Sequence, residues 1–259
     1  MTQLPDELKQ PLAELLLSVA DDKFILGHRN ADWTGLAPIL EEDIAFSSLA
    51  QDELAHASAL YQIAADLLDT KPDKVAYGRR AEEYRCAQIV ELSDEFDWAV
   101  AIARSFFCDH FDYIRLNRLA RSSYTPLAHL AARLVGEEQI HVDHVESWIG
   151  RLGRGTEEAR GRIQGAIDRL APLAPMLLEP IEDQGKLETE GIYPGNAAAM
   201  FQEWREQLER VATDAGVTLS LRPPDANSVG GRRGRHSQAF LPMLDELTEV
   251  YRIEPEAAW

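Results

Sequence analysis

Two Glu-x-x-His pairs are the residues of this chain best suited to chemistry. Glu53 and His56 form the first pair, and Glu138 and His141 form the second. Residues three apart lie on one face of an α-helix, so each carboxylate and imidazole can bind the same metal ion. Two such pairs on facing helices, with one carboxylate from each of two further helices, build the di-iron site of a four-helix bundle. The spacing therefore predicts either a di-iron centre or the frame of one.

The two further carboxylates are expected on the helices that precede the two pairs. Antiparallel helices advance equally, by about 1.5 Å per residue, so the acids must lie at the same height as the pairs. Asp21 or Asp22 meets this condition on the first helix, and Asp109 or Asp112 on the third. We favour Asp109 over Asp112 because it falls among apolar positions, and both choices stay open. The candidate iron ligands are Asp22, Glu53, His56, Asp109, Glu138 and His141.

A metal is not the only use for these groups. A single Glu-x-x-His also occurs as a surface salt link or as part of a helix cap. If the groups do converge, a buried network of acids, histidines and a base could hold the bundle together without metal, provided that each member is paired.

The elements that must position these residues are helices almost throughout. Apolar residues recur near the helical period of 3.6. The expected helices are 6–33, 39–68, 94–121 with Ser93 as N-cap, 126–152, 157–178 with a bend at Pro172 and Pro175, 196–215 and 238–251. Thr156 is expected to cap the fifth helix. The segment 69–91 is expected to be a connection with some helix, and 217–221 is the only strand candidate. We expect one all-α domain over 1–259, with the core bundle at about 6–152 and further helices and an arm at about 156–259.

Composition limits the possible partners and compartments. The net charge is −18, which disfavours nucleic acid and anionic membranes as partners. No apolar run is long enough for a membrane span, and the N-terminus shows no signal sequence. Two cysteines in helical sequence fit a reduced, cytoplasmic protein without a disulfide framework. A basic run at Arg232, Arg233 and Arg235 could bind the phosphates of coenzyme A or a partner, or it could form salt links back to this acidic chain.

Several strings of residues resemble one known family. They are LGHRNADWTGLAPILEEDIAFSSLAQDELAHA, IARSFFCDHFD, HVDHVESWIGRLGRGT and GGRRGRHSQAFLPMLDELTEVYR, and together they span most of the chain. The most specific parts are W-x-G-x-A-P-x-L-E-x-D from Trp33, W-x-x-R-L-G-x-G-T from Trp148, and G-x-x-G-x-H from Gly231. In these parts the chain resembles the C subunits of the ring 1,2-phenylacetyl-CoA epoxidase, a bacterial multicomponent monooxygenase of aromatic degradation.

The resemblance implies a ferritin-like four-helix bundle with additional C-terminal helices. It also implies a structural role in phenylacetate catabolism, in which the chain supports a homologous catalytic A subunit that carries the di-iron centre. Familiar members lack the first Glu-x-x-His pair, whereas this chain retains Glu53 and His56. This departure leaves open whether the chain binds a di-iron cofactor. From the resemblance we expect a non-catalytic partner subunit. The alternative is a di-iron oxygenase or oxidase in its own right, and self-association of the isolated chain stays open.

Overall fold

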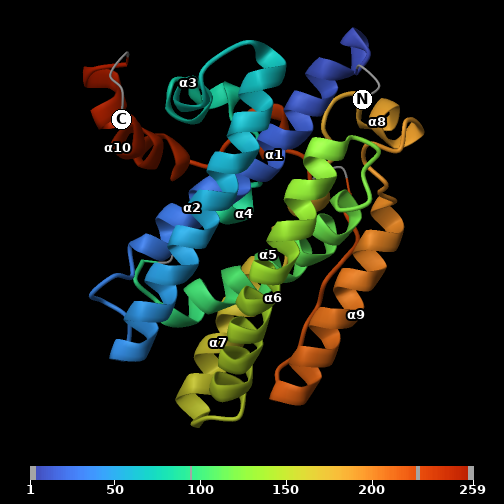
Figure 1. Ribbon diagram of the computed structural model, residues 1–259. Helices are drawn as coiled ribbons and strands as arrows, with labels where there is room; N and C mark the ends of the chain where they lie inside the picture. Colours follow the sequence, from blue (N-terminus) through green and yellow to red (C-terminus); the bar gives the residue numbers. More distant parts are fainter. Residues whose placement is uncertain (1–3, 94, 226–227, 256–259) are drawn as a thin grey trace.

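The computed structural model describes residues 4–93, 95–225 and 228–255, and every regular element in those ranges is helical (Figure 1). This confirms the all-α prediction; the candidate strand at 217–221 is extended chain without strand pairing. The α-helices are α1 (Asp6–Ala31), α2 (Leu40–Leu68), α3 (Pro72–Tyr77), α4 (Gln88–Glu91), α5 (Trp98–Leu119), α6 (Thr125–Gly153), α7 (Glu157–Leu170), α8 (Gln184–Thr189), α9 (Ala197–Ala215) and α10 (Phe240–Ile253). Short 3₁₀ segments lie at Ala81–Glu83, Ala174–Leu178 and Gly231–Arg233.

Two long helix pairs form the bundle. Helix α1 packs along α2, and α5 packs along α6, with a short turn inside each pair (Figure 1). This packing is the arrangement expected of a ferritin-like bundle. It places both Glu-x-x-His pairs on the second helix of their pair, as the sequence indicates.

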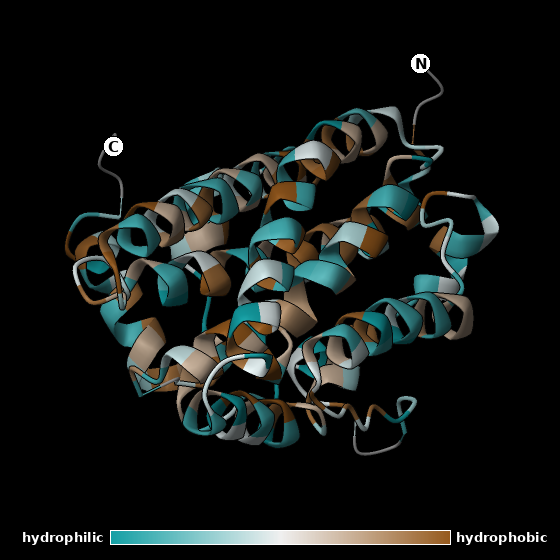
Figure 2. Ribbon diagram, turned by 90° about the horizontal axis from the view of Figure 1, so that it is seen from below, coloured by the Kyte–Doolittle hydropathy of each residue, from teal (hydrophilic) through white to brown (hydrophobic). Residues whose placement is uncertain are grey.

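Shorter helices surround this frame. Helices α7 and α9 pack on α5 and α6, α8 packs on α1, and α10 contacts α3. Seen from below, single helices carry hydrophilic and hydrophobic residues along their length (Figure 2). This alternation is what the helical period in the sequence predicts for amphipathic helices. Within the described residues, no helix has the length and apolar character needed to cross a membrane.

The start of α5 differs from the prediction. Glu95 and Phe96 have positive φ angles of 53° and 58°, which no helix continues through, and the helix begins only at Trp98. The cap is Asp97, whose carboxylate accepts a hydrogen bond from the Ala99 amide at 2.9 Å. Ser93 instead accepts one from the Glu95 amide. The expected first residue of the helix, Asp94, lies outside the described residues.

The segment expected as one bent helix over 157–178 is two elements. Thr156 caps α7 as predicted, by accepting a hydrogen bond from the Ala159 amide. The helix ends at Leu170 just before Pro172, because proline cannot supply the amide that a continuing helix needs. A 3₁₀ segment follows at Ala174–Leu178, and α8 is a short helix that the sequence did not predict.

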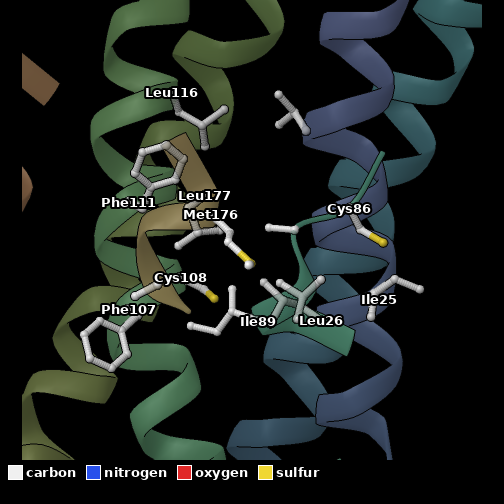
Figure 3. Close-up of a cluster of buried hydrophobic side chains, with 14 of the residues drawn as sticks. Ile25, Leu26, Cys86, Ile89, Phe107, Cys108, Phe111, Leu116, Met176 and Leu177 are labelled. Carbon is white, nitrogen blue, oxygen red and sulfur yellow. The ribbon is translucent and has the colours of Figure 1, made fainter. Parts of the chain in front are cut away.

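The core joins the two helix pairs through residues from the connections. Ile25 and Leu26 of α1 lie opposite Phe107 and Phe111 of α5, and the space between them is filled by side chains from α4 and from the 3₁₀ segment Ala174–Leu178 (Figure 3). Cys86 and Cys108 lie on opposite sides of this cluster, and both are free and buried. The expected absence of a disulfide between the two cysteines is therefore confirmed.

Candidate functional site

A buried lysine lies where the two helix pairs meet. The Nζ atom of Lys23 on α1 lies 3.0 Å from Glu53 Oε2 on α2, 2.7 Å from Glu138 Oε2 on α6 and 3.1 Å from Asp112 Oδ2 on α5. The Lys23 side chain is fully buried, and the three carboxylates are at most 2% exposed. All four helices of the bundle therefore converge on one ammonium group. We call Lys23, Glu53, Asp112 and Glu138 the lysine cluster.

The two histidines bind acids across the bundle. His141 Nδ1 lies 3.3 Å from Glu53 Oε1, so α6 reaches the carboxylate of α2. His56 Nε2 lies 2.5 Å from Glu137 Oε2, so α2 reaches the neighbour of Glu138. The two imidazole rings stack, with centroids 6.1 Å apart. The Glu-x-x-His pairs thus meet as predicted, and each histidine faces an acid of the opposite helix.

Buried charges shift the acidities of the site. Burial lowers the pKa of Lys23, but Asp112, Glu138 and Glu53 outweigh it and raise that pKa well above its usual value. Burial lowers the pKa of His141 too, yet the hydrogen bond to Glu53 and the charge of Glu138 raise it to about 10. Burial, supported by the charge of Glu53, raises the pKa of Glu138 to about 7. Two cations therefore sit among the carboxylates at neutral pH.

Asp21 and Asp22 face away from the lysine cluster. Asp22 accepts hydrogen bonds from the Ala87 amide at 2.8 Å and from Arg115 at 3.1 Å, and it forms an ion pair with Arg232 at 2.6 Å. Asp21 accepts hydrogen bonds from Tyr61 at 2.6 Å and from the Arg85 amide at 2.6 Å, and it pairs with Arg79. Both aspartates thus bind the segment between α2 and α5 to α1. The α1 residue that faces Glu53 and Glu138 is Lys23.

On α5, both proposed acids are buried, and Asp112 makes the central contact. Asp112 binds Lys23 and also pairs with Arg115 one turn later. Burial, followed by the charge of Glu138, raises the pKa of Asp109 well above its usual value. The acid of α5 that contacts the Lys23 ammonium is Asp112.

The carboxylate and imidazole groups of the site are of types that bind a metal, but the Lys23 ammonium occupies the position between Glu53 and Glu138. Glu53, Glu138 and His141 each offer a ligand atom, and these atoms lie within 4.8 Å of one another. Carboxylate oxygens with imidazole nitrogen are donors that iron accepts. A metal bound to Glu53 and Glu138 would stand beside the Lys23 ammonium, which already binds both. With Lys23 in place, the residues do not fit a di-iron centre.

A second buried group offers ligand atoms at the base of the C-terminal arm, residues 228–239. Cys86 Sγ, Glu91 and His236 also place possible ligand atoms within 4.8 Å of one another. His236 Nδ1 lies 2.6 Å from Glu91 Oε1, and the Ser237 amide donates to Oε2 at 2.6 Å. Burial raises the pKa of the Cys86 thiol well above its usual value. Both oxygens of Glu91 are thus satisfied by the arm, which explains the histidine of the G-x-x-G-x-H string.

The basic run of the arm mainly links back to this chain. Arg232 is buried, and its guanidinium binds Asp22 and donates to the Ser18 carbonyl at 2.7 Å. Arg233 Nε lies 3.8 Å from Glu179, and the exposed Arg235 donates to the Val229 carbonyl. The interpretation as salt links within an acidic chain holds for Arg232 and Arg233.

Sequence reasoning missed Lys23, although its position carried a signal. Leu16, Val19, Lys23 and Leu26 follow one another at spacings of three, four and three, which is one face of a helix. A lysine on an otherwise apolar face needs buried acids to pair with it. Those acids are the glutamates of the two pairs.

These features define an all-α, ferritin-like bundle whose central position holds a lysine. The whole chain, residues 1–259, matches the family described as Phenylacetic acid catabolic protein, and the chain belongs to that family. It is also 28% identical to the C subunit of the 1,2-phenylacetyl-CoA epoxidase of Escherichia coli (strain K12), over 96% of this chain and 99% of that protein. The resemblance that the sequence strings indicate is thereby confirmed, and the chain is a member of a phenylacetate catabolism family.

Proposed function

We propose that this chain is a structural partner subunit of a phenylacetyl-CoA ring-epoxidising oxygenase in the cytoplasm, and that it supports a homologous catalytic subunit. The lysine cluster is the observation that carries this proposal. Because the Lys23 ammonium pairs with one oxygen of each of the three carboxylates, the bundle carries its own internal cation where a metal ion would otherwise supply the charge. The full-length likeness to the C subunit of the Escherichia coli epoxidase supports the same role.

A group of exposed apolar side chains at the turn between α1 and α2 supports an interface with another chain. Leu36, Ile39, Leu40 and Ile44 are all exposed, and they lie within nine residues at the turn before α2 and in its first turns. Leu40 and Ile44 are 70% and 66% exposed and are one helical turn apart. Exposed apolar residues gathered in this way are typical of surfaces that bind another protein. We place the contact with the catalytic subunit there.

Co-purification tests the role and the surface together. The chain and its catalytic partner, co-expressed with one tag, should migrate together in mild salt. L40D/I44D should lose the partner, because two carboxylates would be buried unpaired in the interface. V250D/I253D, at similarly exposed positions on α10, is the matched control and should retain it. Separate migration of the wild-type chains would refute the partner role, and equal behaviour of the two variants would refute the surface.

A further inference from the structure

We propose that Lys23 takes the place of a metal ion in this bundle, and that removing its charge creates a site for a divalent transition-metal ion among Glu53, Asp112, Glu138 and His141. This inference deepens the proposed function. Its readout is metal content, so it fails or succeeds independently of co-purification with the catalytic subunit.

The first argument is the match between the ammonium and its acceptors. A protonated lysine has three N–H donors and no acceptor. Three carboxylate oxygens from three helices lie 2.7 to 3.1 Å from Nζ, while Lys23 itself comes from the fourth helix. Metal sites of this bundle class likewise take one carboxylate from each helix. The lysine thus provides positive charge at the point where the four helices would otherwise share a metal.

The second argument is that acceptor atoms are left over around the cluster. Glu138 Oε1 and His56 Nδ1 are buried and have no hydrogen-bond partner among the described residues. His56 Nδ1 lies 4.0 Å from Glu138 Oε2, and His141 Nδ1 lies 4.0 Å from Glu138 Oε1. One ammonium cannot satisfy these additional atoms, whereas a metal ion with four or more coordination positions could.

The third argument is charge. Without Lys23, three carboxylates would face one another in the interior, and their repulsion would favour any cation that can bind them. With Lys23 present, an incoming divalent ion meets a fixed positive charge at the same oxygens. Lys23 therefore both stabilises the bundle and excludes metal.

The experiment compares metal uptake by the wild-type chain and by K23M, with K9M as the matched control. Lys9 is a half-exposed lysine of the same helix, paired with Asp6 at the surface. Each protein is incubated anaerobically with Co²⁺ or Fe²⁺, desalted and analysed for metal, and its thermal unfolding is followed with and without Co²⁺. K23Q, whose amide can still donate to a carboxylate, is measured in parallel in case K23M does not fold.

We expect K23M or K23Q to retain about one Co²⁺ per chain and to gain about 5 to 10 °C in Tm when Co²⁺ is at one hundred times its Kd. Wild type and K9M should retain none at this site. Adding E138Q to K23M should abolish uptake, which locates the metal. The proposal is overturned if the folded lysine variants take up no metal, or if the wild-type chain binds metal that E138Q removes.

Discussion

Replacing Asp22 with asparagine tests whether this residue holds the fold together. Its carboxylate lies between two buried guanidinium groups, at 2.6 Å from Arg232 and 3.1 Å from Arg115. D22N keeps the shape and an acceptor for the Ala87 amide, but it leaves two arginines without their shared charge. Breaking a buried ion pair by removing one partner costs about 3 to 5 kcal/mol. The whole stability of a domain is about 5 to 15 kcal/mol, so the loss should be large.

The assay is urea unfolding followed by circular dichroism, with D22N, R232M and the double variant measured side by side. Because D22N leaves Arg232 unpaired, replacing that arginine as well should recover part of the loss. The double variant should therefore be more stable than the sum of the single losses predicts, by about 1 to 3 kcal/mol. D6N, which alters an aspartate exposed at the start of α1, should stay within about 0.5 kcal/mol of wild type.

Two results would refute this reasoning. One is a D22N protein whose free energy of unfolding lies within about 1 kcal/mol of wild type, since a shared buried carboxylate cannot be lost so cheaply. The other is strict additivity in the double variant, which would mean that Asp22 and Arg232 do not interact.

Two further predictions concern other parts of the structure. Burial and the charge of Arg29 lower the pKa of His28 to about 4, below its unfolded value of about 6.5. The unfolded chain therefore binds a proton that the folded chain does not, and stability is lost as pH falls from about 6.5 toward 4. Between about pH 7 and about pH 4.5, the free energy of unfolding should fall by about 2 to 3 kcal/mol more in wild type than in H28Q. Urea unfolding at the two pH values measures this fall, and an equal fall in both proteins would contradict the prediction. In G231A, the new Cβ would overlap the Cys86 carbonyl oxygen, so the arm must shift, at a cost of about 1 to 3 kcal/mol or more. G161A, which faces open space in α7, should lose nothing in the same thermal or urea unfolding, and equal stability of the two variants would disprove the close contact.

The helices and the meeting of the two Glu-x-x-His pairs could be predicted because both depend on local spacing. The 3.6 period fixes which face of α2 or α6 is buried, and Glu53 and Glu138 lie on those faces. The acid on α1 could not be chosen in this way. Residues 21, 22 and 23 are successive, so each points about 100° from the next, and height alone does not select among them. Only the apolar face through Leu16, Val19 and Leu26 singles out Lys23.

Salt links from the arm back to the chain could be expected from its basic run, but their partners could not be predicted, because these contacts join residues far apart in the chain. Asp22 and Arg232 are separated by 210 positions, and no local pattern indicates that they meet. The break before α5 was missed for a different reason. Glu95 and Phe96 adopt left-handed conformations that residues of these types seldom take, so the residue pattern gives no sign of the break.

The ion pair between Arg232 of the arm and Asp22 of α1 has a consequence for synthesis of the protein on the ribosome. Asp22 is made early and can pair with Arg115, whereas Arg232, the second cation that binds it, is made only after more than two hundred further residues. Until then the newly made N-terminal helices carry a buried acid that lacks one of its two cations. We therefore expect the first helix pair to remain exposed to chaperones and proteases until translation is nearly finished, and to become protected late and abruptly when the arm arrives.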